Sequence, residues 1–275
     1  MTERPGPDGP WHSQDNHPVR LEWGPVGAGF LVGYAAARTS AVIAVVVDVL
    51  SFTTCVSVAA DVGTTVLPYR WGDQSAAAFA SSRGAALAVP RSIAPRAGGI
   101  SLSPRSIREA GAVGSLVLPS PNGATTALAL ADAGATVVAA SLRNATAVGR
   151  WVAHRFRASA APPALVLVPA GERWPDGSLR PAVEDAWGAG GVAAALLDSL
   201  GHQAGPLLLS PEVGLALAGF TSVRDRVDEA LAMCSSGREL IEQGYAEDVA
   251  VAAELDSSTT VPVLTEGAFT SAGLA

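Results

Sequence analysis

The sequence predicts an α/β protein with three layers (α/β/α), in which helices cover both faces of a mixed, mostly parallel sheet. Two observations carry this prediction. Of the 275 residues, 49% are hydrophobic and only 16% are charged, which is typical of a folded globular chain. Apolar runs of strand length also alternate along the chain with Ala-rich segments of helical spacing, as they do where crossover helices connect parallel strands.

The clearest strand–helix–strand unit lies between residues 41 and 69. An unbroken apolar run ends at Val47, and such β-branched runs are typical of strands buried on both faces. Apolar residues then follow helical spacing from Phe52, which predicts a helix over about 51–62. Gly63 supplies the helix stop before a strand over 64–69.

Further elements follow the same reasoning. We predict strands at 19–23, 86–89, 115–119, 135–140, 164–168 and 261–264, and helices at 75–84, 145–157, 186–200 and in several segments after Ser222. The glycines between residues 24 and 33 predict a turn-rich passage, with a hairpin through 30–32 as one form of it.

The two chain ends are predicted to be loose. Residues 1–18 are polar and rich in Pro and Gly, without the apolar segment of a signal peptide, and read as a disordered tail. Residues 265–275 are predicted to fray. Residues 19–264 form either a single α/β domain or two subdomains that divide near 158–164.

The charge balance excludes several classes of function. The net charge is −7, and all 18 basic residues are arginine, so that a P-loop lysine, a Schiff base and a lysine general base are excluded. An acidic chain is also a poor partner for nucleic acid. No apolar run approaches the ~18–20 residues of a membrane span, and we therefore expect a cytoplasmic protein with neither a nucleic-acid nor a membrane partner.

Cysteine and histidine give no sign of a soft metal site. Cys55 and Cys234 fall on apolar faces of predicted helices and read as small buried hydrophobes. The four histidines lack zinc-ligand spacing. A metal in this protein should therefore be a hard cation on carboxylates, which points to Mg²⁺.

Asp48 is the centre of the predicted site. It directly follows the strand that ends at Val47, at the carboxyl edge where open α/β sheets bind ligands. Ser51, Thr53 and Thr54 lie at the start of the next helix, where free N–H groups favour an anion. A carboxylate beside such a helix start suggests phosphate chemistry.

Two other segments can contribute to an anion site. Asn122 begins the helix after the strand at 115–119, either as an N-cap or as a ligand contact, and Gly123 allows close approach to the backbone. Residues 90–110 carry four arginines and form either an exposed loop or a flap over an anionic ligand.

A third strand, over 164–168, ends in a loop that is dense in charge and includes Glu172 and Arg173. Glu184 and Asp185 follow at the start of the next helix. They act there either as simple complements to the helix dipole or as part of the site.

The order of these motifs resembles that of the magnesium-dependent 2-phosphosulfolactate phosphatase family. The matching pieces are residues 47–50 with 53–54, 120–124, 170–172, 184–185 with 188–190, 236–240 with 244, 248–249, and 256 with 261–262. The resemblance implies a layered α/β/α fold and the hydrolysis of a 2-phospho-hydroxy acid, such as (2R)-O-phospho-3-sulfolactate, to a hydroxy acid and phosphate.

The resemblance also implies a Mg²⁺ site on Asp48, Glu184 and Asp185, with Glu172 close by. The sequence departs from the family at Ser51, where an arginine commonly follows the Asp-Val-Leu motif. Such an arginine would bind an oxyanion of the substrate. Arg238 or the arginines of the 90–110 loop can take its place.

We therefore predict a Mg²⁺-dependent phosphomonoester hydrolase that acts on a small anionic phosphorylated substrate and forms a homo-oligomer, a dimer. The catalytic candidates are Asp48, Glu172 and Arg238, and the phosphate-binding candidates are Ser51, Thr53, Thr54, Asn122, Gly123 and Arg173. Asp48 can act as a metal ligand or as a covalent nucleophile, and the lack of an Asp-x-Asp pair favours the metal role. The alternative is a non-catalytic protein that binds a small anion on the same scaffold.

Overall fold

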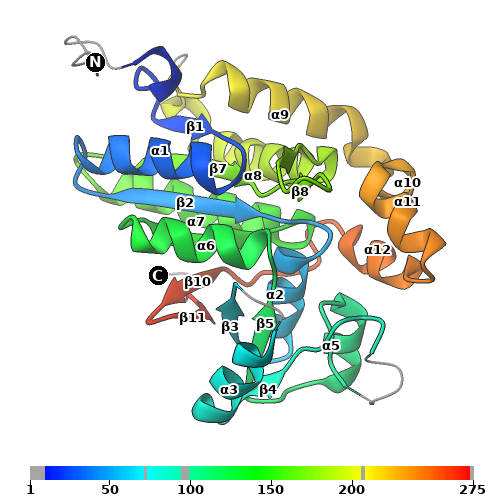
Figure 1. Cartoon of the computed structure of the whole chain (residues 1–275). Helices are drawn as coiled ribbons and strands as arrows, with labels where there is room; N and C mark the ends of the chain where they lie inside the picture. Colours follow the sequence, from blue (N-terminus) through cyan, green and yellow to red (C-terminus); the bar gives the residue numbers. More distant parts are fainter. Residues whose placement is uncertain (1–9, 71–72, 94–98, 206–207, 273–275) are drawn as a thin grey trace.

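The computed structural model describes residues 10–70, 73–93, 99–205 and 208–272. They form a nine-stranded sheet in the order β1-β7-β2-β6-β10-β11-β3-β5-β4, flanked by helices on both faces (Figure 1). The strands are β1 (Val19–Leu21), β2 (Val42–Val47), β3 (Thr65–Tyr69), β4 (Ala86–Leu87), β5 (Ser115–Pro119), β6 (Thr136–Ala140), β7 (Ala164–Pro169), β10 (Pro262–Thr265) and β11 (Ala268–Ser271). The predicted three-layer α/β/α fold is confirmed.

The helices are α1 (Gly24–Ala36), α2 (Phe52–Asp61), α3 (Gln74–Arg83), α5 (Pro104–Ala110), α6 (Gly123–Asp132), α7 (Ala145–Ala158), α8 (Val183–Leu200), α9 (Pro211–Val223), α10 (Val227–Met233), α11 (Ser235–Glu242) and α12 (Ala246–Ala252). A separate two-stranded ribbon pairs β8 (Glu172–Arg173) with β9 (Leu179–Arg180). Among the described helices, none combines the length and the apolar character needed to cross a membrane.

Strand β2 shows how the layers are built. All of its residues are buried, as its apolar run predicts. Val45 and Val47 pack in the core with residues of α7 and α8, whereas Ala44 and Val46 pack in the core with residues of α1, α2 and α6. Successive side chains of a strand point to opposite faces of the sheet, so one valine-rich run supports both helical layers.

The sheet has two parallel parts joined by an antiparallel hairpin. Strands β1, β7, β2 and β6 run parallel to one another, and so do β3, β5 and β4. The hairpin β10–β11 pairs antiparallel with β6 on one side and with β3 on the other. In Figure 1, β3 and β5 run across the direction of β2, and the carboxyl ends of β2 and β5 both lie beside α2.

Several predictions about the chain ends are wrong. Residues 10–18, predicted as disordered, include a 3₁₀ turn over Trp11–Ser13 in which Ser13 is fully buried, whereas residues 1–9 lie outside the described part of the chain. Strand β11 occupies 268–271, which were predicted to fray, because its backbone completes the sheet between β10 and β3. Residues 273–275 of that predicted frayed end again lie outside the described residues.

The turn-rich passage predicted at 24–33 is also wrong, because these residues belong to helix α1. Ala28, Leu31, Val32 and Ala35 form a buried stripe on it at helical spacing. Packing against α6 and β7 outweighs the low helix propensity of the glycines. The prediction also lacks most of helix α9, which begins at Pro211 and includes Ser222.

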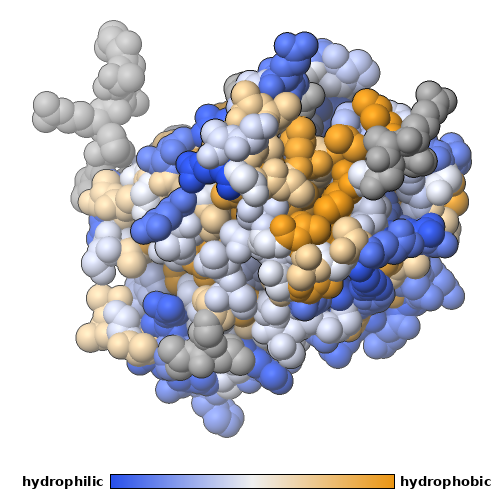
Figure 2. All heavy atoms as spheres, turned by 90° about the horizontal axis from the view of Figure 1, so that it is seen from below, coloured by the Kyte–Doolittle hydropathy of each residue, from blue (hydrophilic) through white to orange (hydrophobic). Residues whose placement is uncertain are grey.

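The side of the molecule that carries α3, β4 and α5 is distinctive. Figure 2, which shows this side from below, has a band of hydrophobic surface between polar regions. Ile93, in the turn after β4, is 51% exposed there.

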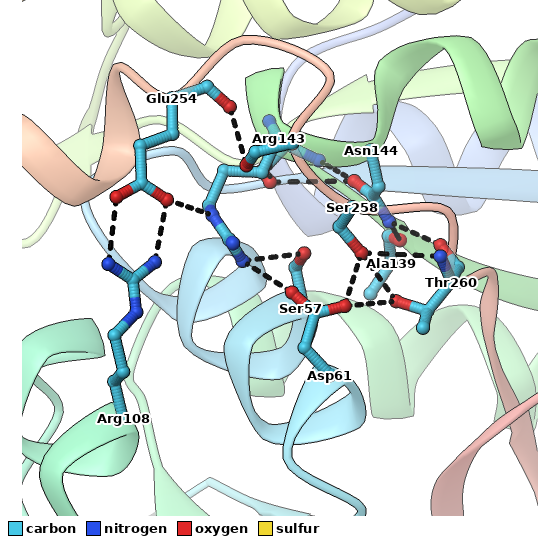
Figure 3. A network of polar contacts seen from close by, with 11 residues as sticks. Ser57, Asp61, Arg108, Ala139, Arg143, Asn144, Glu254, Ser258 and Thr260 are labelled. Carbon is cyan, nitrogen blue, oxygen red and sulfur yellow. Dashed lines mark hydrogen bonds and ion pairs between the residues drawn. The ribbon is translucent and has the colours of Figure 1, made fainter.

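A buried arginine fixes helix α2 in place. Arg143 is 4% exposed, and it binds Asp61 at 3.0 Å and Ser57 at 3.2 Å, both on α2, and Glu254 at 3.2 Å (Figure 3). Arg108 of α5 binds the same Glu254 through two hydrogen bonds, at 2.7 and 2.6 Å. This network ties α2 to α5 and to the turn after α12, and it thereby positions the helix start that follows Asp48.

Candidate active site

Asp48 joins the beginnings of two helices. It is 6% exposed, and its Oδ1 accepts a hydrogen bond from Phe52 N at 3.0 Å while its Oδ2 accepts one from Gly123 N at 2.9 Å. Phe52 begins α2 and Gly123 begins α6. The positive ends of two helix dipoles therefore face one carboxylate, which favours its ionised form.

Gly123 is required by this contact. A Cβ on Gly123 would lie 2.6 Å from Asp48 Oδ2 and 2.5 Å from Phe52 Cδ1, too close for any side chain. The predicted close approach to the backbone therefore occurs, but the group that approaches is the Asp48 carboxylate. The prediction that this N–H binds phosphate is corrected accordingly, because Asp48 already occupies it.

Three hydroxyls predicted to bind phosphate have other partners. Thr53 Oγ1 exchanges hydrogen bonds with the main chain of Asp48 at 2.9 and 2.8 Å, and Thr54 Oγ1 donates to Val49 O at 2.7 Å. Both threonines are fully buried, so their hydroxyls fasten the turn and do not face a ligand. Ser51 Oγ accepts a hydrogen bond from a guanidinium, described below.

Asp185 holds two turns together. Its Oδ1 accepts from Val49 N at 2.8 Å, and its Oδ2 accepts from Gly171 N at 2.9 Å. These residues follow β2 and β7, so one carboxylate at the start of α8 fixes both strand ends. Burial raises the pKa of Asp185 well above its ordinary value, and the charges of Asp48 and Glu184 raise it further.

Glu184 is buried beside a thiol. It is 2% exposed at the start of α8, and its charge acts on Cys234. Burial, followed by the charge of Glu184, raises the pKa of Cys234 to about 12. Burial also raises the pKa of Cys55 well above its ordinary value. Both cysteines are thus buried free thiols, as predicted, and neither is activated as a nucleophile.

Glu172 is a partly buried acid whose pKa lies near neutral pH. Its Oε2 accepts from Asn122 Nδ2 at 2.8 Å. Burial raises its pKa to about 7, and the charges of Asp48 and Glu184 add to that rise. Asn122 makes no side-chain cap to α6, so its side chain serves Glu172 instead of the helix start.

Asp48, Glu172, Glu184 and Asp185 thus form one group, which we call the acidic cluster. Burial raises the pKa of Asp48 to about 6, and Glu184 adds to the rise, against the lowering effect of the two backbone N–H groups. Like charges in a buried site repel one another. The arrangement therefore favours a proton or a cation among these carboxylates.

Arg91, which the sequence points to only as one of several loop arginines, lies beside the start of α2. Its Nη2 donates to Ser51 Oγ at 2.7 Å, and its Nε binds Asp248 Oδ2 at 3.1 Å. Asp248 is 2% exposed and also accepts from Ser103 Oγ. A guanidinium from the 90–110 loop thus reaches Ser51, and its charge lowers the pKa of Asp48.

Arg180 is a second cation that sequence reasoning missed. It lies on β9, at the end of the charged loop, and its charge lowers the pKa of Glu172. Its Nη2 lies 3.5 Å from Ser236 Oγ, and its guanidinium stacks 5.8 Å from the ring of Trp174. The many charged residues of this loop are the sequence signal that could have pointed to Arg180. Its approach to Glu172, however, depends on the two-stranded ribbon, which brings β9 back alongside β8.

Of the two predicted arginines, Arg238 lies away from the acidic cluster, whereas Arg173 lines a pocket together with Glu172 and Asn122. The side chain of Arg238 is 68% exposed and pairs with Glu242 on its own helix at 3.5 Å, so the structure does not bring it to the acidic cluster. Arg173 is exposed, and its guanidinium donates to Gly177 O at 3.0 Å and to Pro121 O at 3.5 Å. It links its own loop to the turn before α6.

The donor set fits Mg²⁺ in chemistry but does not form a complete cage. In the described part of the chain, no group of three or more His, Cys, Asp or Glu side chains is arranged to hold a metal ion. Mg²⁺ commonly binds one or two carboxylates and completes its shell with waters and substrate phosphate. Asp48, Glu184 and Asp185 provide carboxylate oxygens, and Asp48 and Asp185 each already accept two backbone hydrogen bonds.

Comparison with known proteins completes this description. A search of curated proteins gave no significant match. The family model described as 2-phosphosulpholactate phosphatase matches residues 34–267, which include the whole acidic cluster, Arg91 and Arg180. This match covers most of the chain, and the chain therefore belongs to the 2-phosphosulpholactate phosphatase family.

Proposed function

We propose that this protein is a Mg²⁺-dependent phosphomonoester hydrolase that releases phosphate from a 2-phospho-hydroxy acid such as (2R)-O-phospho-3-sulfolactate. The family indicates a phosphatase with a phosphorylated small-molecule substrate. The observation that carries the proposal is the geometry around Asp48: its carboxylate accepts N–H groups from the starts of α2 and α6, and Asp185 beside it joins the turns after β2 and β7.

Asp48 and Glu184 are the residues that would hold Mg²⁺. The two backbone N–H groups on Asp48 fix the direction of its carboxylate and support its charge. When bound, the ion would polarise the phosphoryl group and lower the pKa of a water. Asp185 has a positioning role, because it holds the turns after β2 and β7 against α8.

Glu172 is the candidate for proton transfer. Its pKa of about 7 lies close to neutral pH, where a carboxyl can both hold and release a proton. Asn122 orients it from the turn that precedes α6. In this role Glu172 would hold a proton near the leaving oxygen of the hydroxy acid and transfer it as the ester bond breaks.

Arg91 would bind an anionic group of the substrate. Asp248 and Ser51 hold its guanidinium in one orientation. Arginine presents a rigid fork of donors that matches carboxylate, sulfonate and phosphate oxygens. Arg91 thus supplies the charge that Ser51 lacks at the position after Leu50.

Phosphate release tests this proposal. Purified protein should be incubated with O-phospho-3-sulfolactate and related 2-phospho-hydroxy acids, with Mg²⁺ and after chelation of divalent cations. We expect release with Mg²⁺ and its loss on chelation. Tight binding of these esters without release from any of them would contradict the enzyme proposal and support the anion-binding alternative.

A further inference from the structure

A cavity of about 890 Å³ is lined by Arg91 and Ser120, which contact Ser51 and Gly123 of the candidate site. It lies among α3, β4, the turn after β5 and the segment between α11 and α12. Ser120 Oγ accepts from Gly123 N at 3.2 Å, the same N–H that donates to Asp48, so the inner wall of the cavity is one residue away from the proposed site.

The wall of this cavity combines apolar and charged residues. Leu87, Ala88, Val89 and Leu102 provide apolar surface on the side where Figure 2 shows the hydrophobic band. Arg91 provides a positive charge at the inner end. Ligand pockets commonly combine such an apolar lining with a few fixed polar groups.

The cavity is larger than a three-carbon phospho acid would fill. At roughly 30 Å³ per water molecule, a space of about 890 Å³ corresponds to about 30 waters. Cavities of ~300–1,000 Å³ are typical for ligands with a substantial organic body. A substrate of three carbons bound between Asp48 and Arg91 would leave most of this apolar wall in contact with water.

We propose that the cavity binds an apolar organic group of the substrate, so that this protein prefers 2-phospho-hydroxy acids that carry an aromatic or branched alkyl substituent. The inference rests on the proposed function, since it places the phosphate at the acidic cluster. Arg91 binds the acid group at the inner end, and the substituent packs against Leu87, Val89 and Leu102.

Two phosphate esters test this preference. The protein, with Mg²⁺, should be offered 2-phospholactate and 2-phospho-3-phenyllactate, which differ by one phenyl group. We expect a kcat/KM at least about 10-fold higher for the phenyl ester, because a hydrophobic group of this size in a fitting pocket strongly discriminates between substrates. Equal values, or a higher value for 2-phospholactate, would overturn the proposal.

A cavity-filling variant provides the second arm. Leu102→Trp places a larger ring in the cavity from a partly exposed position, and it should lower the kcat/KM ratio of phenyl ester to plain ester at least about 5-fold. Leu215→Trp, on α9 and 77% exposed, is the matched control and should leave the ratio unchanged. An unchanged ratio in a folded Leu102→Trp protein would contradict the proposal.

Ligand-binding measurements test this inference independently of the proposed phosphatase activity. If none of the 2-phospho-hydroxy acids, O-phospho-3-sulfolactate included, releases phosphate, the proposed function fails, and the cavity is then judged by titrating the protein with the two unphosphorylated acids. Tighter binding of 3-phenyllactate than of lactate, weakened by Leu102→Trp, supports the cavity as the site of an apolar group. Equal affinity for the two acids, or a preference unaffected by Leu102→Trp, overturns it.

Discussion

At the scale of single residues, the contacts of Asp48 require a different interpretation of the motif formed by Asp48 and the helix start that follows it. The residue types around it predict an anion at a helix start, and the structure shows that the anion at two helix starts is Asp48 itself. Asp48 and the nearby acids could be predicted because each follows a strand end in the sequence. Arg91 could not be singled out, because its contact with Ser51 spans 40 residues of chain and depends on tertiary packing.

The Gly123→Ala substitution tests the close contact with Asp48. The new Cβ would lie 2.6 Å from Asp48 Oδ2, so the carboxylate must move and phosphate release should fall. The free energy of unfolding in urea should also fall, by about 1–3 kcal/mol, as is usual for overpacking. Gly214→Ala is the control: nothing lies within 4 Å of its Cβ position, so both activity and stability should be retained.

The pKa of Glu172 predicts a stability that depends on pH. Because the folded protein holds this proton up to about pH 7, whereas an unfolded glutamate loses it near 4.5, the folded state binds more protons between these values. The free energy of unfolding should therefore fall as pH rises from about 4.5 to 7. The contribution of Glu172 is at most about 3 kcal/mol, from the difference between the two pKa values.

Glu172→Gln isolates this contribution. Urea unfolding at several pH values should show a smaller fall in stability between pH 4.5 and 7 than the wild type shows. Glu212→Gln, at an exposed position of α9, should keep the wild-type slope. A Glu172→Gln slope equal to that of the wild type would show that this carboxyl titrates normally in the folded protein.

At the scale of elements, periodicity predicts the parts that the core requires. The buried run of β2 and the spacing in α2 identify a strand and a helix because both elements face apolar layers. Helix α1 escapes prediction because its glycines oppose a helix locally, and only packing on α6 and β7 selects it. Strand β11 escapes because its pairing partners, β10 and β3, are fixed by the whole sheet.

Arg143 is the residue whose loss should loosen α2 most. Arg143→Ala removes the partner of Asp61 and Glu254 and leaves a buried gap, so the free energy of unfolding in urea should fall by about 2–4 kcal/mol. Arg70→Ala is the control, since its ion pair with Asp132 is exposed and should contribute no more than about 1 kcal/mol. Equal losses in the two variants would contradict a special role for the network in Figure 3.

At the scale of the whole molecule, the site lies where the two parallel parts of the sheet meet. The hairpin β10–β11 joins these parts, and α6 runs from β5 in one part to β6 in the other. The carboxyl ends of β2, β5 and β7 can thus deliver Asp48, Asn122 and Glu172 to one place. The sequence predicts the three strand ends separately, but their convergence follows from strand order, which no local pattern contains.

The central claim is that the acidic cluster around Asp48 hydrolyses phosphomonoesters, and the most direct test is phosphate release from O-phospho-3-sulfolactate by Asp48→Asn. With Mg²⁺ present, we expect the wild type to release phosphate and the variant to be slower by at least about 100-fold, the scale of losing one group that acts on the reacting atoms. Asp132→Asn, at an exposed position of α6, should match the wild type. An Asp48→Asn protein that releases phosphate at the wild-type rate would contradict the claim.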